Sequence, residues 1–246
     1  MENPLRLMLR KLKYLRVIDN RGLYLLHEQS HLRQLFELLN IDCVFDVGAH
    51  TGQYAKMIRK YVGYRGPIIS FEPNPDIATI LRKNARGDND WFVEEVALGA
   101  SVGQATFYVT AANQMSSLLQ PQTSETDLFK EHTAIMKKVL VNVSTLEIEL
   151  AKFHKSLRFR RPFLKMDSQG NDLDIAVGAG ARLDEFVGLQ SELAIKRIYA
   201  NAPSYDDALK FYQEKGFILS AFVPNNAGHF PYLIETDCIM FRKVTA

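Results

Sequence analysis

The sequence predicts an α/β fold, a Rossmann-like, doubly wound and mostly parallel sheet with an antiparallel edge. Three observations predict it. An almost continuous apolar run at 41–47 reads as a strand buried on both faces, and a glycine turn and a helical segment follow it. Strand-like and helix-like segments then alternate along the chain, as in βαβ units. Two closing strands, 217–223 and 237–242, are joined directly, which suits an antiparallel edge.

The length and composition fit one large globular domain with small additions. The chain has 246 residues, of which 47% are hydrophobic and 24% charged, and its net charge is +2. This charge is too small to indicate a nucleic-acid partner, and no apolar run has transmembrane length. The two cysteines, Cys43 and Cys238, lie in predicted strands without metal-ligand or disulfide spacing. We therefore expect a cytoplasmic protein without a signal peptide.

Residues 1–40 are predicted to form a helical extension, and residues 41–246 the main domain. Within the extension, 4–16 reads as a basic amphipathic helix. One interpretation is peripheral contact with a membrane surface or an acidic partner. Packing on the domain or on a second copy of the chain, as a homo-oligomer, is favoured, because the leucine face lacks the Trp or Phe of an interfacial anchor. A second helix is predicted to begin at Ser30 as its N-cap. Its apolar stripe consists of Leu32, Leu35, Phe36 and Leu39.

The end of the first strand indicates a ligand site. Asp46 closes the apolar run, and Gly48 and Gly52 bracket the turn before the helix predicted over 53–61. Backbone N–H groups and a helix N-terminus meet there, at the carboxyl end of a parallel sheet, where α/β folds bind ligands. The spacing Gly-x-x-x-Gly lacks the middle glycine of the dinucleotide fingerprint. The turn therefore argues against a nicotinamide dinucleotide.

A second acidic residue ends the next strand, predicted over 68–72. Glu72 lies 20 residues beyond Gly52, and an acid at this position accepts hydrogen bonds from a ribose diol in Rossmann-type sites. We expect ribose binding at Glu72 rather than a solvated surface acid. Asn74 is predicted as an N-cap and Pro75 as the first residue of the following helix.

The remaining elements follow from periodicity and turn signals. Strands are predicted at 90–98, 104–110, 139–143, 163–167 and 187–193, and helices at 144–152, 172–181 and 205–215, the first of these capped by Ser144. Residues 111–138 differ from these elements, because they are polar and weakly periodic. They contain a single short apolar cluster, from Met115 to Leu119. A long polar insertion in a compact domain is usually a lid or a binding loop. We therefore predict a lid at 111–138.

A set of short motifs in a fixed order resembles a known family. Asp46 before the Gly-x-x-x-Gly turn looks like motif I of the class I S-adenosylmethionine-dependent methyltransferases. Over residues 31–242 the chain resembles the FkbM-type branch of that class. The matching segments are 45–52, 70–74, 97–99, 116–118, 145–146, 164–170, 190–193 and 216–217. Departures are His50, where the family often has Asn, and Asn171–Asp172, where it often has Glu and an aliphatic residue. The second departure leaves the role of Asp172 open.

The resemblance implies S-adenosylmethionine as the methyl donor and a seven-stranded sheet with an antiparallel edge hairpin. It also implies O-methylation, often of a hydroxyl of a sugar or a secondary metabolite, so we expect a small-molecule or glycan acceptor. By resemblance and position, the methionine end of the donor would contact Asp46, Gly48, Ala49, His50 and Gly52. Glu72 would bind the ribose, and Asn74, Val96 and Ala97 would flank the adenosine.

Asp167 is the leading residue on the acceptor side, because it ends the strand next to the glycine-turn strand. The competing interpretation is structural, since strand alternation puts Lys165 on the same face, where it would pair with Asp167. His229 and His132 lie in predicted loops and could act as the base, and Lys165 could orient an acidic substrate group. Substrate contacts are expected from Ser116, Ser117, Gln169 and Glu192. No metal site is expected.

Three functions compete. The leading hypothesis is an O-methyltransferase acting on a small molecule or a glycan. A nicotinamide-dependent oxidoreductase shares the strand, turn and helix and the acid at the second strand. A non-catalytic binding module on a methyltransferase fold is the third, and the intact acids Asp46, Glu72 and Asp167 argue against it.

Overall fold

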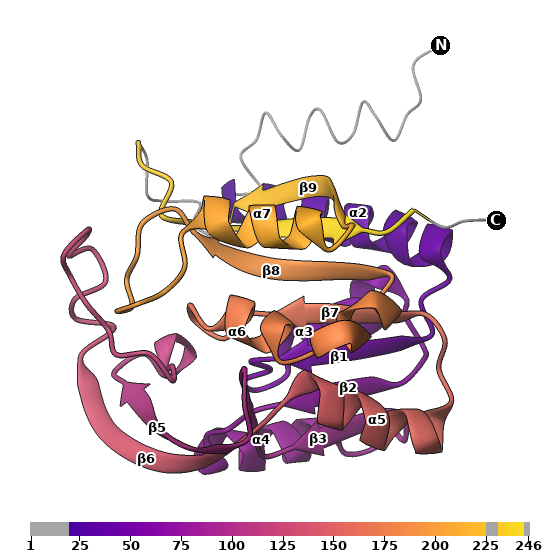
Figure 1. The fold of residues 1–246 in the computed structure, drawn as a ribbon, viewed down its shortest axis with the longest axis horizontal. Coiled ribbons are helices and arrows are strands. Elements are labelled where there is room, and N and C mark those ends of the chain that lie inside the picture. Colours follow the sequence, from indigo (N-terminus) through magenta and orange to yellow (C-terminus); the bar gives the residue numbers. More distant parts are fainter. Residues whose placement is uncertain (1–19, 225–230, 244–246) are drawn as a thin grey trace.

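The computed structural model describes residues 20–224 and 231–243, with side chains from residue 25 onward. Its centre is a seven-stranded sheet in the order β3-β2-β1-β7-β8-β10-β9 (Figure 1). The strands are β1 (Cys43–Val47), β2 (Ile68–Phe71), β3 (Trp91–Glu94), β7 (Pro162–Met166), β8 (Gly188–Ala194), β9 (Ile218–Pro224) and β10 (Glu235–Phe241). β10 is antiparallel to β8 and to β9, and the other neighbours in the sheet are parallel. The predicted doubly wound sheet with an antiparallel edge is confirmed.

Helices cover both faces of this sheet. On one face, in front in Figure 1, lie α5 (Leu146–Leu157), α6 (Asp172–Val177) and α7 (Tyr205–Glu214), which bury Leu150, Ile175 and Tyr212. On the other face α2 (Asn20–Leu39), α3 (Gln53–Met57) and α4 (Pro75–Ala85) contribute to a second apolar cluster. Every residue of β1 and β7 is buried, because these two strands contact both layers. The carboxyl ends of β1 and β7 are therefore the most firmly held part of the sheet edge.

A smaller sheet has the order β4-β6-β5, from β4 (Ala97–Leu98), β5 (Gly103–Thr110) and β6 (Ile135–Ser144). β5 and β6 pair as an antiparallel hairpin. The chain between them contains a 3₁₀ turn, Asn113–Met115, and Met115 packs against Ile198 and Tyr199. Because β6 begins at Ile135, the segment predicted as a lid shortens to 111–134.

Several predicted boundaries are wrong, each for a local reason. Ser30 is not an N-cap, because α2 runs continuously through it from Asn20. The strand predicted at 90–98 is interrupted after Glu94, since the next two paired residues join β6 instead of β2. The cap of α5 is Thr145, whose hydroxyl accepts from the N–H of Ile148 at 3.4 Å, and Ser144 still belongs to β6.

Other boundaries are confirmed or shift slightly. Asn74 caps α4 as predicted, with its side-chain oxygen accepting from the N–H of Asp76 at 3.2 Å. The helix predicted over 53–61 is α3 followed by a π-helical turn, Ile58–Val62. The stripe of Leu32, Leu35, Phe36 and Leu39 is buried as predicted. The helix predicted at 4–16 lies outside the described residues. In the part of the chain that is described, no helix is long and apolar enough to span a membrane.

Candidate active site

The turn after β1 is held against two neighbouring strands. The N–H groups of Gly48 and Ala49 both donate to the carbonyl oxygen of Phe71, at 3.1 and 3.0 Å, which fixes the turn to the end of β2. Gly48 has φ +73°, and a Cβ atom there would lie 1.9 Å from the carbonyl oxygen of Asp167. Glycine is therefore required at 48 by the backbone and by the chain that follows β7. Gly52, at φ +85°, similarly packs its Cα against Trp91.

Glu72 is buried at the end of β2 and binds the same turn. One of its carboxylate oxygens accepts from the N–H of His50 and the other from the N–H of Asn74, both at 2.9 Å. Burial raises the pKa of Glu72 to about 7, against the lowering effect of these two hydrogen bonds. Each oxygen keeps a further lone pair, so a diol can still donate to this carboxylate.

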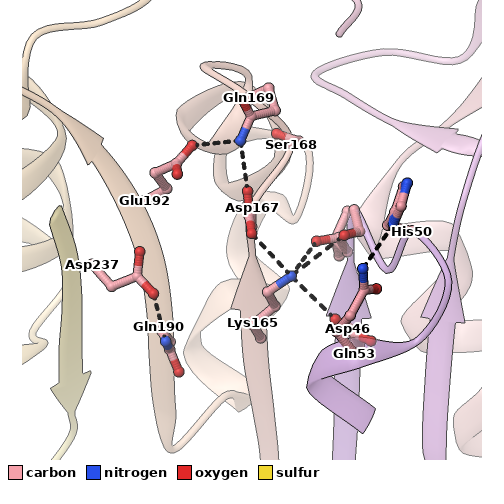
Figure 2. Close-up of polar contacts among 12 residues, drawn as sticks. Asp46, His50, Gln53, Lys165, Asp167, Ser168, Gln169, Gln190, Glu192 and Asp237 are labelled. Carbon is pink, nitrogen blue, oxygen red and sulfur yellow. Dashed lines mark hydrogen bonds and ion pairs between the residues drawn. The ribbon is translucent and has the colours of Figure 1, made fainter. Parts of the chain in front are cut away.

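Lys165 joins the two acids predicted at the site (Figure 2). Its ammonium group lies 3.3 Å from Asp46, which is fully buried, and 3.6 Å from Asp167, whose side chain is 39% exposed. It also donates to the carbonyl oxygens of Val47 and Gly48, at 3.5 and 3.4 Å. Burial alone would lower the pKa of Lys165, but Asp167 and Asp46 raise it above its usual value. Lys165 therefore stays protonated, and the predicted Lys165–Asp167 contact is present.

Gln169 holds Asp167 from the other side. The amide nitrogen of Gln169 donates to Asp167 and to Glu192, both at 3.0 Å (Figure 2). Its amide oxygen accepts from the hydroxyl of Tyr199 at 2.7 Å. Its backbone oxygen accepts from Ser117 at 2.8 Å, and its backbone is left-handed, with φ 59°. Such a conformation is uncommon for a residue other than glycine, asparagine or aspartate. The amide of Gln169 is thus committed to protein groups, and its visible effect is to orient Asp167.

Two clefts open along the carboxyl ends of the central strands. The first is lined by Glu72 and by the apolar side chains of Val96, Ala97 and Phe107, and Ser116 and Gln169 also line it. The second lies against α2 and α3, with Tyr54 and Lys165 in its wall. Both clefts are lined by Gly48, His50, Gln114 and Asp167. The two cavities therefore meet beside Asp167.

Of the histidines considered for the site, His50 lies at the junction of the two clefts and His132 does not. His50 has φ 48°, and its Nδ1 lies 2.9 Å from the amide nitrogen of Gln53. Burial lowers the pKa of His50, so the ring is neutral, and a donor at Nδ1 places the proton on Nε2. That Nε2 is buried and has no partner among the described residues. His132 is exposed and is not among the residues lining either cleft. His229 lies outside the described residues.

Some predicted site residues take supporting positions. Asp46 lies behind Lys165 and accepts from Ser70 at 3.1 Å, and burial raises its pKa while Lys165 opposes that rise. The hydroxyl of Ser116 accepts from the N–H of Thr110 at 3.1 Å. Asn74 caps α4 outside both clefts. These residues shape the site through their neighbours.

The role of Asp172, which the sequence leaves open, is structural. Asp172 is buried, and one of its oxygens accepts from the N–H and the hydroxyl of Ser168, at 2.8 and 2.6 Å. The other oxygen accepts from the hydroxyl of Ser191 and the N–H of Glu192, both at 3.0 Å. Asp172 therefore attaches the turn that contains Gln169 to strand β8.

The residues lining the second cleft that the sequence prediction missed include Glu28, Tyr54, Gln190 and Asp237. The available signal was the presence of polar residues within predicted strands, as at Gln190 in β8 and Asp237 in β10. Among the described residues, no group of three or more His, Cys, Asp or Glu is arranged to hold a metal ion.

Comparisons with known proteins identify a family for this chain. The FkbM methyltransferase domain matches residues 46–219. No curated protein matches the sequence significantly. Similar solved structures include a putative RNA methyltransferase from Pyrococcus horikoshii, with 16% identity and a TM-score of 0.44, covering 89% of this chain and 84% of that one. Magnesium protoporphyrin IX methyltransferase from Synechocystis has 9% identity and a TM-score of 0.44, over 92% and 85% of the two chains. Aeropyrum pernix fibrillarin, solved with S-adenosyl-L-methionine, has 13% identity and a TM-score of 0.43, over 81% and 66%.

A doubly wound seven-stranded sheet of this order, with a glycine turn after β1 and a buried acid after β2, defines a class I methyltransferase. The matched domain covers most of the sequence, and the chain belongs to the FkbM methyltransferase family. It is an S-adenosylmethionine-dependent methyltransferase, and the oxidoreductase and binding-module alternatives are set aside. The identities to the solved structures are too low to transfer a substrate.

Proposed function

We propose that the protein transfers a methyl group from S-adenosylmethionine to a hydroxyl oxygen of a small molecule or a glycan. The observation that supports this proposal is the meeting of two clefts at Gly48, His50 and Asp167. Methyl transfer needs a donor and an acceptor held end to end, with the reacting atoms at the junction. A carboxylate at such a junction suits a hydroxyl acceptor, because it can accept a hydrogen bond from the hydroxyl group.

The first cleft fits the donor by its chemistry. Glu72 offers carboxylate oxygens for a ribose diol, and Val96, Ala97 and Phe107 offer apolar surface for a flat base. Gly48 leaves the turn open for close approach, and the neutral His50 has an unpartnered buried nitrogen beside it. Bound there, S-adenosylmethionine supplies a methyl group already activated on a sulfonium. In this proposal Asp46, Ala49 and Gly52 support the turn, and Asn74 supports Glu72.

Asp167 is the proposed base or hydroxyl orienter. It lies at the junction, keeps 39% of its side chain exposed, and is oriented by Gln169 at 3.0 Å and Lys165 at 3.6 Å. Lys165 is protonated and cannot itself be the base. The residues 111–134 are proposed as a lid, because Gln114 lines both clefts from this segment. Closing it would exclude water from the junction.

The cell compartment belongs to the same proposal. Cys43 and Cys238 are both buried free thiols, which fits a reducing cytoplasm. The small net charge favours an acceptor other than a nucleic acid.

Two measurements test the proposed function. Calorimetry with S-adenosylhomocysteine should show one saturable site, whose affinity drops in Glu72→Ala because a charge-assisted hydrogen bond worth about 1.5–3 kcal/mol is lost. Mass spectrometry should then find the label from isotopic S-adenosylmethionine on a hydroxyl oxygen of an acceptor from a panel of sugars, glycosides and hydroxylated metabolites. Label found only on nitrogen or carbon atoms would refute O-methylation. Wild-type affinity in folded Glu72→Ala would refute the ribose assignment.

A further inference from the structure

Gln169 is the closer of the two groups that orient Asp167. Its amide nitrogen lies 3.0 Å from the carboxylate of Asp167, whereas the ammonium group of Lys165 lies 3.6 Å away. The same nitrogen donates its second hydrogen to Glu192 at 3.0 Å (Figure 2). A terminal amide turns readily about its last side-chain bond. The orientation of Asp167 therefore also depends on what holds the amide oxygen of Gln169.

The amide oxygen of Gln169 is held by the hydroxyl group of Tyr199, a residue that is 2% exposed. The two oxygen atoms lie 2.7 Å apart, and no other donor to this amide oxygen is found among the described residues. Gln169 lines the first cleft. Without the hydroxyl group, the amide oxygen would gain a new partner by turning toward water in that cleft. The amide nitrogen would then move away from Asp167.

The hydroxyl group of Tyr199 has a second acceptor. The carbonyl oxygen of Met115 lies 2.8 Å from it, and Met115 ends the 3₁₀ turn that contains Gln114. A tyrosine hydroxyl carries one hydrogen, so Met115 and Gln169 share it. Gln114 lines both clefts. Tyr199 therefore connects a turn that ligands in either cleft would contact with the amide that orients Asp167.

The backbone on both sides of Tyr199 is attached to the proposed lid. The N–H of Gln122 donates to the carbonyl oxygen of Ile198 at 2.9 Å, and the N–H of Ala200 donates to that of Gln120 at 2.8 Å. These two hydrogen bonds hold the loop that carries the tyrosine ring. The direction of the hydroxyl group therefore follows the position of the lid.

We infer that Tyr199 is a positioning residue for methyl transfer. Its hydroxyl group keeps the amide of Gln169 turned toward Asp167, and Asp167 then presents its carboxylate to the acceptor hydroxyl at the junction of the clefts. Because Met115 shares the hydroxyl hydrogen, a ligand that moves the turn at 113–115 changes the hydrogen bond to Gln169. The lid and the carboxylate are thereby coupled. This inference rests on the proposed function, because it takes Asp167 as the base or hydroxyl orienter.

The first test needs no acceptor. Tyr199→Phe removes the hydroxyl group and keeps the ring. Tyr64→Phe is the matched control, because Tyr64 is also buried and donates to a backbone carbonyl oxygen, that of Pro67 at 3.2 Å, but lines neither cleft. On samples saturated with S-adenosylhomocysteine, heteronuclear NMR follows hydrogen exchange at the side-chain amide of Gln169, whose signal is assigned by its loss in Gln169→Glu. Exchange should become about threefold to tenfold faster in Tyr199→Phe, the range for loss of one hydrogen bond, and should be unchanged in Tyr64→Phe.

The second test separates positioning from a structural role. It measures single-turnover methyl transfer to the acceptor that the isotope-labelling panel identifies. Tyr199→Phe should lower the rate by about threefold to tenfold in the otherwise wild-type protein but by less than about twofold in Asp167→Asn, because the hydroxyl group acts through that carboxylate. A tyrosine with only a structural role would lower the rate by the same factor in both backgrounds.

Three results would overturn the inference: unchanged exchange of the Gln169 amide in Tyr199→Phe, faster exchange confined to the backbone of 111–134, or equal rate factors in the two backgrounds. Calorimetry with S-adenosylhomocysteine is run on the same samples. A protein that binds S-adenosylhomocysteine but gives one of these results keeps the proposed function and loses only the role of Tyr199. Failure to bind S-adenosylhomocysteine, or normal transfer by Asp167→Asn, contradicts the proposed function itself.

Discussion

Asp167 combines a structural contact with a proposed role in the chemistry. The pairing with Lys165 that a structural role requires is present, at 3.6 Å. Lys165 is closer to Asp46, however, at 3.3 Å, so Asp167 is not its sole counter-charge. The carboxylate that remains partly exposed at the junction is the one that can contact an acceptor.

Replacing this carboxylate should separate the two roles. In Asp167→Asn we expect the affinity for S-adenosylhomocysteine to stay within a few-fold of that of the wild type. Thermal stability should also stay close to that of the wild type, because Lys165 keeps its ion pair with Asp46. Turnover should fall by about 10²-fold or more, the usual scale for removing a general base. Thermal melting and single-turnover methyl transfer measure both quantities. Normal transfer by the folded variant would exclude a catalytic role.

Lys165→Met provides the contrast. It should leave Asp46 as a buried carboxylate without a counter-charge, at a cost of about 3–5 kcal/mol in the free energy of unfolding. The two substitutions thus lie on one ion-pair network but should affect different measurements. A large loss of stability in Asp167→Asn alone would favour the structural interpretation.

Glu72 should make nucleoside binding depend on pH. Its pKa lies near 7, and only the ionised form offers full acceptor capacity to a ribose. The affinity for methylthioadenosine, which keeps the ribose but lacks the titrating amino acid, should rise roughly tenfold from about pH 6 to about pH 8. Glu72→Ala should bind weakly at every pH. A pH-independent wild-type affinity would contradict the assignment.

The raised pKa of Glu72 also determines how the stability of the protein changes with pH. The pKa of Glu72 is raised on folding from 4.5 to about 7, so the folded state binds the proton more tightly than the unfolded chain. Glu72 therefore lowers the stability of the ligand-free protein as pH rises through this interval. A ligand that donates hydrogen bonds to the carboxylate should offset that loss.

At the scale of elements, the segment 111–134 is the part that connects both clefts. Its first part is anchored, because Ser117 pairs with Tyr108 and Met115 packs on Tyr199. Its middle, from Thr123 to Glu131, is largely exposed and has no regular secondary structure. An anchored loop with an exposed middle is suited to close over a ligand.

Hydrogen exchange should detect this closure. We expect slower exchange in 111–134 when the protein is saturated with S-adenosylhomocysteine and an acceptor, with the largest change near Gln114. Strand β6, which follows in sequence and pairs with β5 from Lys137 to Val143, serves as the internal control and should not change. Equal exchange rates in 111–134 with and without ligands would count against a lid.

At the scale of the whole molecule, the sequence indicates the residues around the first cleft far better than those around the second. The strand, turn and acid that build the first cleft lie within 41–74, so their spacing along the chain reports their contact in space. Glu28, Gln190 and Asp237 come from three distant elements that meet only because β8 and β10 are neighbours in the sheet and α2 packs nearby. Strand order is a property of tertiary packing, and periodicity carries no information about it.

Local errors have a similar origin. Ser30 has the right chemistry for an N-cap, but helix propensity on both sides carries α2 through it. Asp172 is an acidic residue next to a predicted site, so its residue type is compatible with a functional role. Only its four hydrogen bonds reveal a structural role. In both cases the residue type is compatible with two roles, and tertiary contacts decide between them.

The close approach of Gly48 to Asp167 has a thermodynamic consequence. The proposed donor turn and the proposed acceptor carboxylate follow adjoining strands whose backbones are in close contact, and Lys165 contacts both. The two ligands would therefore bind to one rigid part of the structure, and we expect their binding to be positively coupled. A bound acceptor should raise the affinity for S-adenosylhomocysteine, and bound S-adenosylhomocysteine should raise the affinity for the acceptor by the same factor. Calorimetric titrations in both orders measure that factor. A factor of one would mean that donor and acceptor bind independently. A factor above one would favour the ternary complex over the two binary complexes.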